Sequence, residues 1–96
     1  MESRGIIYPK KMLDGFTFNR IIGSGGNSDV CLYEQGLQTV AIKFDIKNAL
    51  LAESYLLKEI YERNGTIFPK YIKHGTVRIM DSTHFYLAME YLPYSI

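Results

Sequence analysis

The sequence has little of three things that would narrow its function at once: cysteine, charge of one sign and long apolar runs. Cys31 is the only cysteine, which excludes an internal disulfide and a zinc site built from cysteines. The formal net charge of +1 gives no basic field for nucleic acid. No apolar stretch is long enough for a membrane span or a signal peptide, so we predict an intracellular, cytoplasmic protein that binds neither membrane nor nucleic acid.

The composition indicates a folded domain. Apolar residues make up 47% of the chain and charged residues 22%, which is typical of a globular protein rather than a disordered one. A chain of 96 residues is one small domain and has room for one modest core. No segment repeats, and none has low complexity.

Hydrophobic alternation predicts five strands. Residues 1–15 show no sustained period, and we expect them to be a leader that lies over the domain or stays loose. The expected strands cover residues 16–22, 29–34, 39–45, 71–80 and 84–92. Residues 81–83, Asp-Ser-Thr, are the expected turn between the last two strands.

One helix is predicted within residues 48–65, with Asn48 as its N-cap and Asn64-Gly65 as its stop. Its apolar residues are expected to share one stripe: Ala49, Leu50, Leu56, Leu57, Ile60 and Tyr61. The predicted fold is therefore α+β, a five-stranded antiparallel sheet with one helix in the order β-β-β-α-β-β.

Three features are hard to explain by packing alone. The stretch "IIGSGGNSDV" places three glycines in four positions between two strands. Lys43 lies inside the predicted strand "VAIKF", and Glu53 lies beside the apolar stripe of the helix, where a carboxylate needs a cation nearby. Each feature also has an ordinary explanation, because glycines form turns and charged side chains are usually solvated. Their combination and order favour a function.

The glycine stretch lies between two strands, which argues against a dinucleotide-binding fold or a P-loop. It resembles the glycine-rich loop of protein kinases, followed by Val-Ala-Ile-Lys43 and by a helix carrying Glu53. The stretch "FYLAMEYL" is similar to the kinase strand that leads into the hinge. Residues 16–94 thus resemble the amino-terminal lobe of a eukaryotic-type Ser/Thr protein kinase, with residues 95–96 as the start of a missing carboxy-terminal lobe.

The resemblance implies roles for individual residues. Lys43 would pair with the α- and β-phosphates of ATP and form an ion pair with Glu53, the two residues assigned to catalysis. Met89 would be the gatekeeper, and the backbones of Glu90 and Leu92 would bind the adenine edge. Leu57 would belong to the hydrophobic spine. The full set of implied ATP contacts is Ile22, Gly23, Ser24, Gly25, Gly26, Asn27, Ser28, Val30, Ala41, Lys43, Met89, Glu90 and Leu92.

Some residues depart from the family pattern. Ser28 replaces the third glycine, and His74 stands near a spine position that is usually apolar, where we expect a core histidine with a satisfied nitrogen. The chain contains no H-R-D and no D-F-G, so it lacks the base and the magnesium ligands of a kinase. Magnesium would be held only with a carboxy-terminal lobe. We therefore expect no phosphate transfer by this chain alone.

Three interpretations remain open: the ATP-binding lobe of a larger kinase, a naturally short kinase-like protein, such as a viral one, that binds and regulates a kinase, or an interaction domain without nucleotide binding. Retention of Lys43 and Glu53 favours the first two over the third. The expected partners are ATP, bound weakly, and a protein or second copy bound through an exposed lobe–lobe face.

That face is expected to include Leu50, Leu57, Ile72 and Leu92. The alternative is that the leader covers it with apolar residues from its own sequence, namely Ile6, Ile7, Tyr8, Met12 and Leu13.

Overall fold

The computed structural model of the chain describes residues 5–26, 28–64 and 69–91. Six strands and one helix follow one another in the order β-β-β-β-α-β-β. They are β1 (Lys11–Met12), β2 (Phe16–Gly25), β3 (Ser28–Gln35), β4 (Gln38–Asp45), α1 (Ala49–Arg63), β5 (Tyr71–Ile79) and β6 (Ser82–Glu90).

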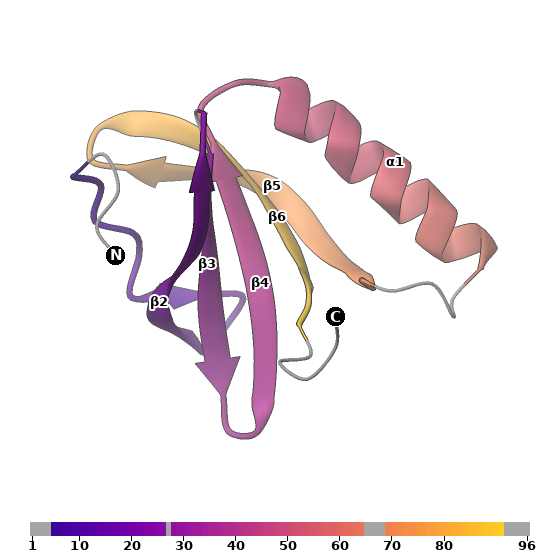
Figure 1. Cartoon of the computed structure of the whole chain (residues 1–96), viewed down its shortest axis with the longest axis horizontal. Coiled ribbons are helices and arrows are strands. Elements are labelled where there is room, and N and C mark those ends of the chain that lie inside the picture. The colour runs from indigo at the N-terminus through magenta and orange to yellow at the C-terminus, as the bar shows by residue number, and fades with distance from the viewer. Residues whose placement is uncertain (1–4, 27, 65–68, 92–96) are drawn as a thin grey trace.

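The six strands form one antiparallel sheet in the order β1-β2-β3-β4-β6-β5. The sheet is strongly curled, with α1 beside β5 and β6 and the N-terminal segment on the other side, next to β2 (Figure 1). An α+β fold with an antiparallel sheet and one helix is therefore confirmed. The prediction of five strands was wrong, because Lys11 and Met12 pair with Thr17 and Phe16. A strand of two residues is too short to show a period of two.

The two faces of the sheet have different roles. Along β4, Val40, Ile42 and Phe44 point into the main core, where they are at most 3% exposed. The intervening residues Ala41 and Lys43 point to the opposite face, because successive side chains of a strand alternate. The main core is completed by residues of the same face on other strands and by the N-terminal segment: Tyr8, Met12, Cys31, Tyr33, Ile79, Tyr86 and Ala88.

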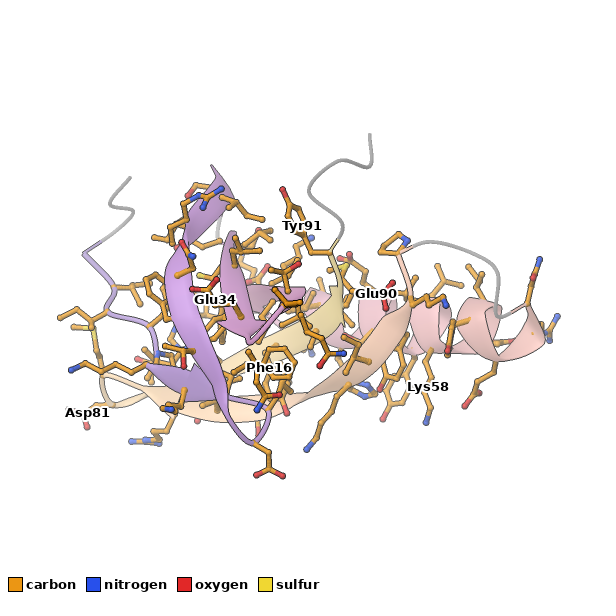
Figure 2. All side chains as sticks on the ribbon, turned by 90° about the horizontal axis from the view of Figure 1, so that it is seen from below. Phe16, Glu34, Lys58, Asp81, Glu90 and Tyr91 are labelled. Carbon is orange, nitrogen blue, oxygen red and sulfur yellow. The ribbon has the colours of Figure 1, made fainter. Side chains whose placement is uncertain are left out.

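The N-terminal segment is part of the core rather than a loose leader. The ring centroid of Tyr8 lies 4.7 Å from that of Phe44, and Tyr8 is 6% exposed. The Tyr33 hydroxyl donates a hydrogen bond of 2.7 Å to the carbonyl of Pro9. Phe16, which follows the segment, also points into the curl of the sheet (Figure 2). The segment thus covers the face opposite Lys43, and not the expected lobe–lobe face.

Helix α1 packs on β5 and β6 through fewer apolar residues than the sequence predicts. Leu50 and Ser54 are its buried residues, and Leu57 and Tyr61 are half-buried. The Ser54 hydroxyl donates to the Leu50 carbonyl at 2.7 Å, so its burial leaves no polar group unpaired. The expected single stripe was wrong for three residues, since Ala49 is exposed, Leu56 is 60% exposed and Ile60 is 36% exposed.

Both ends of the helix lie where the sequence predicts them, while Gly65 of the predicted stop lies outside the described residues. Asn48 occupies the N-cap position but makes no side-chain capping bond, and Asn64 is the C-cap.

In the described ranges, no helix has the length and apolar character needed to cross a membrane.

The turn between β5 and β6 consists of Met80 and Asp81, so it begins one position and ends two positions earlier than the predicted turn at residues 81–83. Met80 and Asp81 have φ values of 49° and 69°, and Ile79 pairs directly with Ser82. Two residues with positive φ between paired strands form a tight hairpin turn that matches the sheet's twist. The predicted turn at residues 81–83 was wrong because methionine is not a usual residue for this conformation, so its sequence signal is weak.

Burial protects the single thiol. Cys31 is fully buried, and this burial, together with the nearby Asp29 carboxylate, raises its pKa from 9.0 to about 12. The folded state therefore favours the protonated thiol, a contribution that is complete below pH 9 and lost as the pH rises towards 12.

We expect Cys31 to react with a thiol reagent at pH 8 much more slowly in the folded protein than in urea. The free energy of unfolding should also fall above pH 9, less steeply in Cys31→Val than in the wild type. Fast labelling of the folded chain, or equal alkaline slopes for the two proteins, would contradict this account.

Candidate functional site

The face of the sheet opposite the main core carries the residues singled out by the sequence. Lys43 lies on β4 between Val30 of β3 and Leu87 of β6, its two cross-strand partners. Ala41, two residues before Lys43 on β4, lies next to Met89 of β6. Because cross-strand partners share a face, the sheet places these side chains together beside α1. We call this surface the site face.

Lys43 makes an ion pair with the helix. Its Nζ lies 3.1 Å from Glu53 Oε1, and the two side chains are 27% and 48% exposed. A pair this open to water contributes at most about 1 kcal/mol to stability. Its main structural effect is to fix the direction of the Lys43 ammonium, which would otherwise be free to rotate. The contact brings together two residues ten positions apart that the sequence analysis had singled out.

The glycine hairpin, residues 22–28, joins the end of β2 to the start of β3, and its Gly23 pairs with Val30, the neighbour of Lys43. Its strands stay paired almost to the tip, with Ser24 opposite Asp29 and Gly25 opposite Ser28. Ser24, Gly25 and Gly26 are exposed. Asn27 lies outside the described residues.

The fold itself explains only one of the three glycines. Gly26 has a φ of 48°, a conformation that favours glycine. Gly23 and Gly25 have no positive φ. A Cβ on Gly25 would meet no atom of the chain within 4 Å, and one on Gly23 would make only an ordinary contact of 3.9 Å with the Cβ of Val30. The chain's own packing would therefore accept alanine at both positions.

Three further residues predicted to contact ATP lie in or next to the hairpin: Ile22, Ser28 and Val30. The pairing of β2 with β3 shifts between Ile21 and Gly23, which leaves Ile22 without a partner at a bulge. The Ser28 hydroxyl lies 3.4 Å from the Gly25 carbonyl, a long hydrogen bond that spans the tip. Ile22, Ser28 and Val30 are all half-buried.

The end of β6 is held by β4 and by the start of β5. The Glu90 N–H donates to the Lys70 carbonyl at 3.0 Å, so a backbone bond from Glu90 to a ligand would have to use its carbonyl oxygen. The Thr39 hydroxyl donates to the Tyr91 carbonyl at 2.8 Å, and the Tyr91 N–H donates to the Thr39 carbonyl at 3.3 Å. Glu90 and Tyr91 lie together at this end of the strand (Figure 2). Leu92, another predicted contact, lies outside the described residues.

His74 is held by two aromatic side chains. The Tyr71 hydroxyl and His74 Nδ1 share a hydrogen bond of 2.6 Å, and the Tyr55 ring of α1 packs edge-on to the imidazole at 4.8 Å. The histidine is half-buried. It joins β5 to the helix, as expected for a packed histidine with one satisfied nitrogen.

The apolar residues that are exposed differ from those predicted for the lobe–lobe patch. Leu50, in the first turn of α1, is 2% exposed, so it cannot belong to an open patch. Ile72 is 43% exposed, and Leu57 is half-buried. The outer side of α1 instead exposes Leu56 and Ile60, which lie one turn apart.

One polar contact near the hairpin was missed from the sequence. Asp29 is fully buried on the core face, and its carboxylate accepts a hydrogen bond of 2.5 Å from the Tyr8 hydroxyl. Alternation in "SDVCLY" gives a partial signal, because Asp29 shares a face with the core residues Cys31 and Tyr33. The contact with Tyr8, 21 positions earlier, has no local signal.

Comparison of the chain with protein-family models and with curated protein sequences finds no match. Within residues 5–26, 28–64 and 69–91, no three His, Cys, Asp or Glu side chains gather in a group able to hold a metal ion. The site face itself combines an oriented ammonium at Lys43, an exposed glycine hairpin on one side of it and the apolar side chains of Ala41 and Met89 on the other.

Proposed function

We propose that the site face binds ATP weakly, as the amino-terminal lobe of a Ser/Thr protein kinase does, and that these 96 residues do not transfer phosphate by themselves. The observation that carries the proposal is the ion pair between Lys43 and Glu53, one strand away from the glycine hairpin. A fixed ammonium near an exposed glycine hairpin is a suitable environment for phosphate oxygens.

Three features of the site face fit a nucleotide. Gly23 and Gly25 lack side chains where the fold does not require their absence, which leaves the backbone open to close approach by phosphates. Lys43 supplies the positive charge, and Glu53 orients it. Ala41 is small and lies beside Met89, so this part of the face is apolar and able to pack against a base.

The strand arrangement also supports the proposal. The strand carrying Lys43 lies between the second hairpin strand and β6, and the helix carrying Glu53 contacts β6 and β5. This is the arrangement that the resemblance to a kinase lobe implies. The lack of H-R-D and D-F-G sequences leaves the chain without the carboxylates that act as base and metal ligands in kinases.

The test is calorimetric titration of the chain with ATP and, as the control ligand, adenosine. We expect an ATP dissociation constant of about 0.1 mM or weaker, because half of a kinase's nucleotide contacts come from elsewhere. Adenosine should bind more weakly still, because it offers Lys43 no phosphate. Equal binding of both ligands, or no binding of ATP at about 10 mM, would contradict the proposal.

Exposed apolar residues on α1 favour a second candidate function, association with a protein partner or a second copy. Tyr55 and Leu56 are 56% and 60% exposed, and Ile72 of β5 is 43% exposed. Exposed apolar side chains that gather on one surface often mark an interface.

For this second candidate we expect the mass measured by light scattering to rise with protein concentration, and to rise less in Leu56→Glu. Leu37→Glu is the matched control, since Leu37 is fully exposed in the turn between β3 and β4. A constant monomer mass at all concentrations would exclude self-association.

A further inference from the structure

The buried carboxylate of Asp29 lies at the base of the glycine hairpin. Asp29 is the cross-strand partner of Ser24, and it is fully buried. Burial of a carboxylate is costly unless hydrogen bonds compensate it. The Tyr8 hydroxyl supplies one such bond at 2.5 Å. A carboxylate at this position therefore ties the hairpin to the N-terminal segment.

The N-terminal segment is itself held firmly. The Tyr8 ring packs on Phe44 with centroids 4.7 Å apart, and the Tyr33 hydroxyl binds the carbonyl of Pro9, the next residue. The segment thus meets β3 at two hydroxyl contacts: one at Asp29, beside the hairpin, and one at Tyr33, four residues further along the strand. Only the first lies next to the glycines.

Strand β3 links the Tyr8–Asp29 hydrogen bond on the core face to residues of the site face. Val30, the next residue, points to the opposite face, where its cross-strand partners are Gly23 and Lys43. Beyond this point Ser24, Gly25 and Gly26 are exposed to solvent, whereas Asp29 is fully buried. The buried contact at Asp29 therefore restrains the hairpin next to Gly23 and Val30, and Val30 is the cross-strand neighbour of Lys43.

We propose that Tyr8 and Asp29 are positioning residues that fix the base of the glycine hairpin relative to Lys43, so that docking of the N-terminal segment and binding of nucleotide are coupled. The inference rests on the proposed function for its nucleotide arm. In the protein without nucleotide, loss of the Tyr8 hydroxyl should also loosen the hairpin.

The central variant is Tyr8→Phe, which keeps the ring in the core and removes only the hydroxyl. Its matched control is Tyr33→Phe, which removes the other hydroxyl between β3 and the N-terminal segment. We expect Tyr8→Phe to speed amide hydrogen exchange at Gly23, Gly25 and Gly26 and to weaken ATP binding about three- to tenfold. Tyr33→Phe should cost similar stability but change both readouts by less than about twofold.

A double variant tests whether Tyr8 and Asp29 act through one shared contact or destabilise the protein independently. Asp29→Leu, which removes the acceptor, should weaken ATP binding at least as much as Tyr8→Phe does. The combination should bind no more weakly than the worse single variant, because both changes remove the same contact. Additive losses would contradict a shared role.

The outcomes distinguish this inference from the proposed function. If the wild type binds no ATP, the proposed function fails, and hydrogen exchange at the hairpin still decides whether Tyr8 positions it. If ATP binds but Tyr8→Phe leaves exchange at the glycines unchanged, the positioning claim is overturned alone. Equal effects of Tyr8→Phe and Tyr33→Phe would also overturn it, since they would indicate a merely structural role.

Discussion

Replacement of Lys43 by methionine is expected to weaken ATP binding about tenfold or more, because charge-assisted hydrogen bonds to phosphate are lost. Methionine keeps an unbranched chain of similar length, so packing between Val30 and Leu87 should persist. The ion pair with Glu53 is open to water, and its loss should change the free energy of unfolding by no more than about 1 kcal/mol. Calorimetry and urea unfolding measure the two effects.

The control for Lys43→Met is Lys11→Met, which removes the same charge from β1, an exposed position outside the site face. Its ATP affinity should match the wild type. Glu53→Gln should have an intermediate effect, since it leaves the ammonium in place but removes the charge that orients it. If Lys11→Met weakens binding as much as Lys43→Met, ATP binding is a general effect of positive charge and not a property of this site.

Truncation of the aromatic pair in the core should have the largest effect on stability. We expect Phe44→Ala, and also Tyr8→Ala, to lower the free energy of unfolding by about 3–5 kcal/mol, measured by urea unfolding. The two rings contact each other at 4.7 Å and are 1% and 6% exposed. Such a loss is a large part of the stability of a small domain, about 5–15 kcal/mol.

The double variant Tyr8→Ala, Phe44→Ala should lose less than the sum of the two single losses, because the rings stabilise each other. Ile46→Ala serves as the control, since Ile46 follows β4 and is 54% exposed. A small effect of Tyr8→Ala beside a large effect of Phe44→Ala would mean that the N-terminal segment lies on the domain without contributing to its core.

Local patterns were enough to predict most of the sheet and the helix. Alternation in β3 and β4 separates the two faces, and the glycines mark the hairpin between β2 and β3. The contact between Lys43 and Glu53 was expected from a resemblance in motif order. The structure provides what periodicity alone lacks, namely the cross-strand register that places Lys43 beside Val30.

The errors have a common physical origin. The apolar stripe of α1 was predicted from residue type, whereas the buried side is decided by which residues face β5 and β6, so Ser54 is buried and Leu56 is not. Strand β1 and the contact between Tyr8 and Asp29 arise from tertiary packing of a segment without any periodic pattern. Long-range contacts of this kind leave no trace in a local sequence window.

The most direct measurement of the central claim is a map of amide chemical shifts during titration of the isotope-labelled chain with ATP. The account predicts that the largest changes fall on the glycine hairpin, Lys43 and the end of β6, which surround the site face. Residues of the opposite face away from the Tyr8–Asp29 contact, such as Met12 and Ile79, should change little. Changes that are spread evenly over the surface, or centred on the N-terminal segment, would contradict nucleotide binding at this site.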